Sequence, residues 1–216
     1  NDLAKHIKII FLAILVQNLN SQEVFFPVDS NSEHVFFKGH NGNPSIFTLK
    51  GVYTYSDKWK FQPIALDSLK TNALILKSKQ KFNNETLISF TRNKNTFFVL
   101  NGGGYVFKLA DNKLSREDNS VLQNNQLNSA VFYYKNQIHM HGGYGFWSFK
   151  NYTTFLDNDT GQWELVYPKS KFLPIARWKM ISNLIGDKFF VLGGRGNLTE
   201  NYRKDALLNS HYFFDL

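Results

Sequence analysis

His139 and His141 have the spacing in this sequence that comes closest to a metal-binding pair. They lie two residues apart in the segment QIHMH, so both side chains are expected on one face of a β-strand. A zinc site needs further Cys, His or carboxylate ligands. No carboxylate and no third histidine accompanies this motif, and a glycine pair follows it directly. We therefore expect both histidines to pack or form hydrogen bonds inside the fold, and we predict no metal and no other cofactor.

Asp157 and Asp159, in the segment LDNDTG, have the residue types of a calcium loop or an acid/base pair. Asp and Asn also accept hydrogen bonds from the backbone two residues on, and Thr-Gly completes a hairpin connection. We therefore predict a turn between two strands. The same structural role is expected for Glu117, Asp118 and Asp187.

Two glycine-rich segments, NGGGY at 101–105 and GGRG at 193–196, have the composition of phosphate-binding loops. Phosphate loops lead into a helix N-terminus and carry a Lys-Ser/Thr ending. Neither segment is followed by a helix start or by that ending. These glycines are therefore expected to be structural.

The composition limits the class of protein. With 216 residues, 43% of them hydrophobic and 16% aromatic, the chain has enough apolar side chains for one well-buried domain. The formal net charge is +8, but the basic residues are scattered singly and match no nucleic-acid motif, so no nucleic-acid contact is predicted. The absence of Cys excludes disulfides, thiolate metal sites and a cysteine nucleophile.

The N-terminus has the pattern of an export signal. Lys5 and Lys8 precede an apolar run at 9–16, and small Ser21 follows the polar Asn18 and Asn20. The run is much shorter than the ~20 residues of a bilayer-spanning helix. We predict a signal peptide over 1–21, a periplasmic or cell-surface location for 22–216, and membrane attachment only through a region outside this chain. A buried N-terminal helix or strand is the alternative.

Residues 22–216 alternate in short apolar runs separated by Asn, Gly, Asp, Lys and Pro, which predicts an all-β fold. Residues 64–79 form the only weakly helical window, and 73–77 fit an extended segment equally well. The predicted strands are Val35–Phe37, Ser45–Leu49, Val52–Tyr55, Leu87–Thr91, Thr96–Leu100, Gly104–Ala110, Ala130–Tyr134, Gln137–His141, Tyr152–Leu156, Trp163–Val166, Lys179–Leu184, Lys188–Leu192 and Ser210–Asp215.

A strand followed by a glycine pair occurs three times, as FFVLNGGG, QIHMHGGY and FFVLGGRG. The pairs are Gly102–Gly103, Gly142–Gly143 and Gly193–Gly194, which begin 40 and 51 residues apart (102 to 142 and 142 to 193). Periods of ~40 to 50 residues with about four strands each are typical of β-propeller blades. Residues without Cβ suit positive φ and close backbone approach where a strand leaves a sheet. A large ring on an outer strand would fill the gap between sheets.

The units resemble the kelch-repeat family of β-propellers. The third matches best: residues 130–163 supply paired strands, Gly142–Gly143, a TTFLDNDTGQW turn and Trp163. The fourth resembles the family's proline-arginine lead-in at Pro174 and Arg177. The second lacks the tryptophan. The first has Trp59 but no glycine pair.

The resemblance implies an incomplete propeller with about four blades, truncated at the C-terminus, because HYFFDL ends within a unit. The alternative is that a strand from near Val35 completes the last blade and closes a small ring.

In kelch proteins the loops after the second strand and those joining the blades share a face that commonly receives the ligand. The resemblance therefore implies a ligand-binding set: Tyr105, Tyr144, Trp147, Arg177, Trp178 and Arg195. Phe146 and Asn197 lie in the same loops. Aromatic rings with Arg suit a peptide, a carboxylate or a sugar. The alternative is that Tyr144 and Trp147 pack between blades and that Arg177 pairs inside the fold.

The expected function is a non-catalytic binding or sensory propeller of an exported bacterial protein, such as a receptor ectodomain, with a protein, peptide or glycan ligand. A periplasmic carbohydrate-active enzyme, either a sugar isomerase or a sialic-acid processing enzyme, is the alternative on the same fold.

Overall fold

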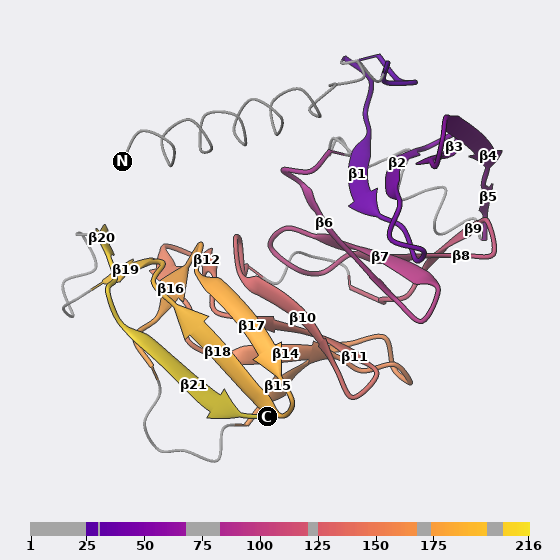
Figure 1. Ribbon diagram of the computed structural model, residues 1–216. Helices are drawn as coiled ribbons and strands as arrows, with labels where there is room; N and C mark the ends of the chain where they lie inside the picture. The colour runs from indigo at the N-terminus through magenta and orange to yellow at the C-terminus, as the bar shows by residue number, and fades with distance from the viewer. Residues whose placement is uncertain (1–24, 30, 68–82, 121–124, 168–173, 198–204) are drawn as a thin grey trace, which may run out of the picture. The chain divides into compact units, whose positions relative to one another are not determined.

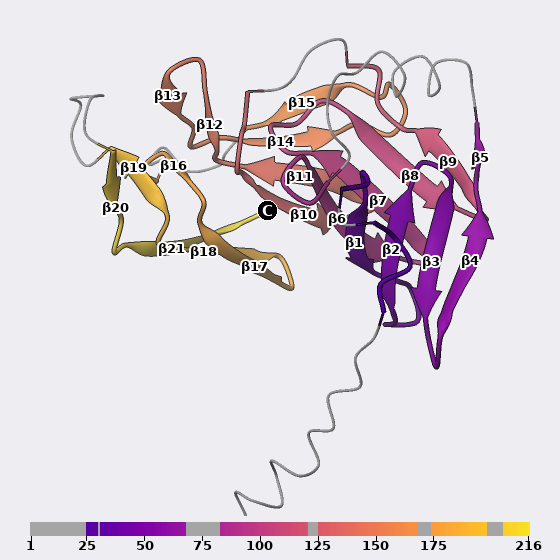
Figure 2. The same ribbon diagram turned by 90° about the horizontal axis from the view of Figure 1, so that it is seen from above.

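The computed structural model describes residues 25–29, 31–67, 83–120, 125–167, 174–197 and 205–216 (Figures 1 and 2). The chain divides into two compact units, Asn1–Ser32 and Glu33–Leu216. All named strands lie in the second unit, and none of the described residues is helical, so the predicted all-β class is confirmed. The described part of the chain accordingly has no helix with the length and hydropathy needed to span a bilayer. The predicted signal peptide, 1–21, and most of the ambiguous 64–79 segment lie outside the described residues.

The first two sheets are antiparallel meanders. The first sheet has four strands, β1 (Val35–Lys38), β2 (Pro44–Thr48), β3 (Gly51–Tyr55) and β4 (Trp59–Pro63). The second has the strand order β5-β9-β8-β7-β6, in which β5 alone pairs in parallel. Its strands are β5 (Ala65–Leu66), β6 (Leu87–Arg92), β7 (Asn95–Leu100), β8 (Val106–Ala110) and β9 (Lys113–Arg116). The first unit of the sequence, which has no glycine pair, thus forms a regular sheet.

The third sheet repeats the four-stranded antiparallel pattern. Its strands, in order, are β10 (Ala130–Tyr134), β11 (Gln137–His141), β14 (Thr153–Leu156) and β15 (Trp163–Val166). A small hairpin between β11 and β14 consists of β12 (Tyr144–Gly145) and β13 (Ser148–Phe149). Sequence analysis predicted the four main strands to within one residue but did not predict this hairpin.

The fourth sheet has three antiparallel strands in the order β17-β18-β21. They are β17 (Ile181–Ile185), β18 (Lys188–Leu192) and β21 (His211–Asp215). A further three-stranded sheet has the order β16-β19-β20. Along the chain, its strands come just before β17, just after β18 and just before β21. Its strands are β16 (Arg177–Trp178), β19 (Arg195–Asn197) and β20 (Asp205–Leu207).

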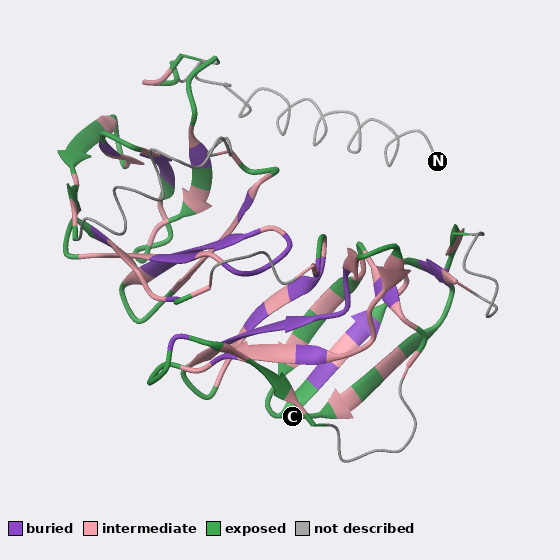
Figure 3. Ribbon diagram, turned by 180° about the vertical axis from the view of Figure 1, so that it is seen from behind, coloured by how far each residue is buried: buried purple, intermediate pink, exposed green. Residues whose placement is uncertain are grey.

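Apolar clusters join the successive sheets face to face. One combines Phe47 of the first sheet with Phe98 of the second, and the next combines Val99 of the second sheet with Met140 of the third. The last joins Phe132 of the third sheet to Phe189 of the fourth, with ring centroids 4.1 Å apart. Strands β7 and β11 are buried almost throughout because both faces of their sheets are covered (Figure 3).

The glycine pairs have the backbone conformation that the sequence predicts. Gly102–Gly103, Gly142–Gly143 and Gly193–Gly194 all have positive φ, between 61° and 115°. A Cβ on Gly143 would lie 2.6 Å from the backbone of Gln126, so only glycine fits where β11 leaves its sheet.

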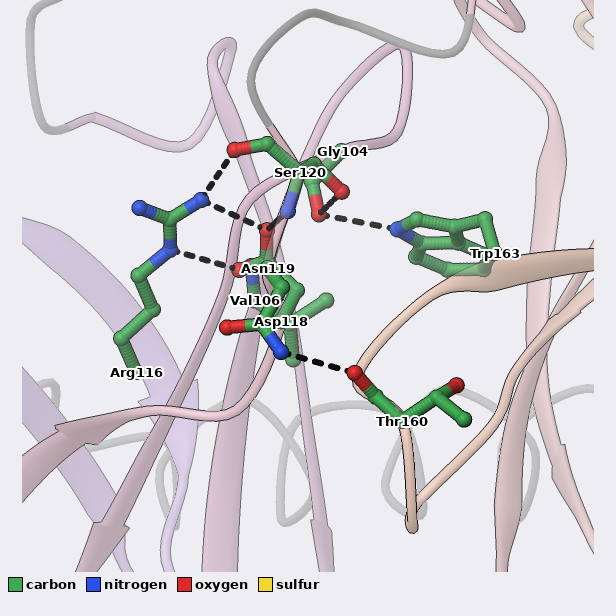
Figure 4. Close-up of polar contacts among 8 residues, drawn as sticks. All are labelled: Gly104, Val106, Arg116, Asp118, Asn119, Ser120, Thr160 and Trp163. Atoms are coloured by element: carbon green, nitrogen blue, oxygen red, sulfur yellow. Dashed lines mark hydrogen bonds and ion pairs between the residues drawn. The ribbon is translucent and has the colours of Figure 1, made fainter.

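Trp163 fills the space between the second and third sheets, as predicted for an outer-strand ring. It packs on the cluster around Val99 and Met140, and its Nε1 donates to the Gly104 carbonyl oxygen at 2.9 Å. Beside it, the buried Asp118 carboxylate accepts hydrogen bonds from the Arg116 guanidinium and from the Val106 and Ser120 amides (Figure 4). Trp59, in β4, lies against Tyr55 within the first sheet, with centroids 5.3 Å apart.

Asn119 connects this network to the turn after β14. Its backbone amide donates to the Gly161 carbonyl at 2.7 Å, and its side-chain amide donates to the Thr160 carbonyl at 2.7 Å (Figure 4). Within that turn, the Asp157 carboxylate accepts bonds from the Asp159 and Thr160 amides and from the Thr160 hydroxyl. The predicted turn role of Asp157 is confirmed, and the hydrogen bonds from Thr160 lower the pKa of its carboxyl group.

Candidate functional site

The β12–β13 hairpin has two aromatic residues at its tip. Phe146 and Trp147 form the two-residue connection between Gly145 and Ser148, with φ of 46° and 62°. Their exposed fractions are 77% and 89%. Positive φ is a marked outlier for bulky side chains, so both residues are held in an unfavourable backbone conformation and project into solvent.

Three other two-residue connections have positive φ at both positions, and each of them contains Asn. They are Asn93–Lys94, Asp111–Asn112 and Lys135–Asn136, all with positive φ. Turns of this kind favour Asn, Asp and Gly. The Phe146–Trp147 connection therefore departs from the turn chemistry that the same chain uses elsewhere, and packing does not explain the departure because both side chains are exposed.

A cluster of three rings lies at the base of the hairpin. Tyr144 and Phe149 pair across β12 and β13, and Trp178 of β16 contacts both, with centroids 5.6 Å and 6.2 Å away. The Lys179 Nζ lies 4.8 Å from the centroid of the Trp178 ring. Backbone hydrogen bonds between Tyr144 and Leu127 in both directions tie the hairpin to the neighbouring segment. Tyr144 and Trp178, both expected on the ligand-binding face, belong to one aromatic cluster.

Arg195 is joined to this cluster through strand pairing. It lies opposite Trp178 in the β16–β19 pair, and its Nε is 2.8 Å from the Asp205 carboxylate. The side chain remains half exposed, so it is accessible beside the aromatic cluster. Asn197, which also follows the last glycine pair, continues the same strand.

Arg177 lies inside the fold. The prediction that it lies on the accessible ligand-binding face is therefore wrong. Only 1% of the residue is exposed. Its guanidinium donates to the carbonyl oxygens of Ile175, Gly193 and Ser210 and to the Ser210 hydroxyl. This agrees with the alternative that Arg177 pairs inside the fold, and a guanidinium used in this way is not available to a ligand at the surface.

Arg177 is part of a buried polar network between the third and fourth sheets. Its guanidinium carbon lies 4.6 Å from the centroid of the Tyr212 ring. The Tyr212 hydroxyl is 2.8 Å from His141 Nε2, and His141 Nδ1 is 2.8 Å from the Thr153 hydroxyl. Burial, with the nearby Arg177 charge, lowers the pKa of His141 to about 3, and burial raises the pKa of Tyr212 to about 12. The network is therefore expected to hold a neutral imidazole and a neutral phenol at neutral pH.

His139 is also buried, as predicted. Its ring stacks on Phe132 with centroids 5.1 Å apart, and burial lowers the pKa of its imidazole. Among the described residues, no group of three His, Asp or Glu side chains has the arrangement of a metal site.

Tyr105 is not part of the aromatic cluster. It packs against the core between the first and second sheets, and the Arg116 guanidinium lies 5.1 Å from its ring centroid. Of the predicted ligand-binding residues, the structure thus groups Tyr144, Trp147, Trp178 and Arg195 around one hairpin, and it places Tyr105 and Arg177 elsewhere.

Phe149, Lys150 and Lys179 also belong to this site, and sequence analysis did not select them. The signal that could have identified Phe149 and Lys150 is the segment GYGFWSFK, in which a two-residue loop of bulky aromatics lies between short alternating runs. Lys150 Nζ donates to the Ser148 hydroxyl at 2.7 Å, which places an ammonium group beside the hairpin tip. The site therefore combines exposed rings with cations, an arrangement suited to stacking and cation–π contacts.

Comparison with known proteins adds no family assignment: no model of a protein family matches the chain, and no curated protein is significantly similar to it.

Proposed function

We propose that this chain is a kelch-like propeller segment that acts as a binding module without catalysis. Four features support the propeller: successive antiparallel sheets, glycine pairs after the second strand of three of them, Trp163 between two sheets, and the Asp157 turn. The order of these features along the chain is that of the kelch-repeat family, and the face-to-face apolar clusters are of the kind by which propeller blades stack.

The observation that carries the binding function is the aromatic hairpin. Exposed aromatic residues are the most frequent anchors of binding sites, and Trp and Arg dominate binding energies at interfaces. Here Trp147 and Phe146 are exposed at a backbone conformation that costs stability, above Tyr144 and Trp178 and near Arg195. We propose that these loops bind a protein, peptide or glycan.

The proposed setting is an exported protein, as the periplasmic or cell-surface ectodomain of a receptor. This rests on the residue pattern of 1–21 alone. N-terminal sequencing of the native protein tests it: a mature start at Gln22 is expected, and retention of residues 1–21 would contradict export.

The binding function is tested by thermal unfolding of the chain with a panel of sialic acids, neutral oligosaccharides and short peptides. At least one class is expected to raise Tm, because a ligand that binds only the folded state stabilises it. Arg195→Gln is expected to lower the affinity for that ligand about tenfold, because it removes a charged donor beside the rings. Lys188→Gln is the matched control, because Lys188 forms a similar exposed ion pair with Asp215 in β18 and β21.

Three results would count against this proposal. If no probe changes Tm, the chain does not bind sugars or peptides of these classes. If Lys188→Gln weakens binding as much as Arg195→Gln does, the site lies elsewhere. Chemical conversion of a sugar in the panel would favour the carbohydrate-active enzyme instead.

A further inference from the structure

The tip of the β12–β13 hairpin has the chemistry of an element that inserts into a lipid surface. We propose that Phe146 and Trp147 enter the interfacial layer of a bilayer with anionic headgroups, and that Lys150 and Lys179 contact those headgroups. This contact goes beyond the proposed ligand binding, for which it leaves Tyr144, Trp178 and Arg195 at the base of the hairpin. It also adds a membrane contact within this chain, where sequence analysis expected attachment only through a region outside it.

The shape of the tip indicates what it can contact. Phe146 and Trp147 are the two central residues of a two-residue hairpin, and both are more than three-quarters exposed. Figure 2 shows β12 and β13 extending beyond the neighbouring strands β14 and β15. Sites for small molecules are concave and cover most of their ligand. A two-residue tip with large exposed rings is convex. Such a tip is suited to insertion into a lipid surface.

The backbone conformation of the tip is unfavourable for its two residues. Both residues have positive φ, and every other described residue with positive φ is Asn, Asp, Lys or Gly. Backbone outliers cluster at ligand-binding and switch regions, and exposed apolar groups mark interaction sites, so the combination favours a functional tip. Trp and Phe are the residues that amphipathic membrane-surface elements present to the acyl boundary.

The charge around the tip indicates a preference for anionic surfaces. The hairpin and the two segments that contact it, 125–129, 143–151 and 174–180, contain no Asp or Glu, and their accessible cations are Lys150 and Lys179, since Arg177 is buried. Lys150 Nζ binds Ser148, the residue that follows Trp147, and Lys179 lies over the Trp178 ring. Lysines beside a membrane surface attract anionic lipids. The net charge of +8 gives the whole chain the same preference.

A protein partner is a weaker match for the same features. A stable protein–protein contact covers about 800 Å² on each partner, with a central anchor surrounded by a polar rim. The two tip residues are the most exposed apolar side chains here, while Leu127 beside Tyr144, Ile175 and Leu207 opposite Arg195 are separate exposed positions on other segments. Insertion into a bilayer requires only a few apolar side chains, assisted by nearby cations.

The experiment is co-sedimentation of the chain with vesicles. One set contains phosphatidylcholine alone and the other an equimolar mixture of phosphatidylcholine and phosphatidylglycerol. We expect sedimentation with the anionic vesicles, weakened by added salt. The double variant Phe146→Asn/Trp147→Gly is expected to weaken it at least about tenfold because it removes both inserted rings. Asparagine and glycine suit the turn, so this variant retains the hairpin.

Two further variants complete the design. Asn136→Gly, at the tip of the β10–β11 connection, makes a matched change of turn residue and is expected to bind vesicles as the unaltered chain does. Lys150→Gln/Lys179→Gln is expected to weaken binding to the anionic vesicles only. Urea unfolding of each variant confirms that it folds.

Several results would overturn the proposal. These are failure of the unaltered chain to bind either kind of vesicle, and binding that Phe146→Asn/Trp147→Gly leaves unchanged. Equal binding to both kinds of vesicle would overturn the assignment of anionic headgroups. If the tip variant instead abolishes the Tm shift caused by a sugar or peptide and vesicles are not bound, the tip belongs to the proposed ligand site and not to a membrane contact.

Discussion

At the scale of single residues, His141 shows how burial determines the role of a side chain. The expectation that the histidines of QIHMH pack inside the fold is confirmed, and His141 is almost fully buried against Thr153 and Tyr212. The contacts with β21 could not be predicted, because Tyr212 lies 71 residues away in the sequence. Arg177 was misplaced for the same reason: its partners Gly193 and Ser210 come together only in the folded chain.

His141 should make the stability of the protein depend on pH. Its pKa is about 3 in the folded state, well below the ordinary value of 6.5, so folding favours the neutral imidazole. The stabilisation is complete above pH 6.5 and is lost as pH falls from there toward 3. Between pH 6.5 and pH 5 the loss is expected to be about 2 kcal/mol.

Urea unfolding at pH 7.5 and pH 5 measures this effect. His141→Gln can retain hydrogen bonds to Thr153 and Tyr212 but cannot bind a proton, so its stability should change less between the two values of pH. An equal change in both proteins would show that His141 does not carry the effect.

At the scale of elements, alternating apolar residues identified most strands, and short or polar strands were missed. Strands β4 and β9 were not predicted because WKFQP and KLSR each combine Lys with few apolar residues. β16 and β19 have two and three residues, too few for any periodicity. The site depends on these short elements, since β16 brings Trp178 onto Tyr144.

The β12–β13 turn allows a prediction about stability. Replacing Phe146→Asn and Trp147→Gly substitutes residues that accept positive φ for residues that do not. The free energy of unfolding is expected to rise by about 1 kcal/mol. Urea denaturation measures it, and a decrease in stability would show that the exposed rings contribute to packing.

At the scale of the whole molecule, the glycine period predicted consecutive sheets of similar construction. The structure has sheets at 35–63, 87–116, 130–166 and 181–215, joined by apolar clusters. The period indicates the repeat because each glycine pair marks the end of the second strand in its sheet. It did not predict β5, which joins the second sheet in parallel, or the three-stranded sheet of β16, β19 and β20. Both depend on pairing between segments that no local pattern connects.

The central claim is that the loops around the aromatic hairpin bind a ligand, and amide hydrogen exchange tests it most directly. The chain is compared with and without whichever sugar or peptide raises its Tm. The account predicts slower exchange at 143–149, 177–179 and 195–197. Protection confined to the turns at 135–136 and 157–161, with no change around the hairpin, would contradict it.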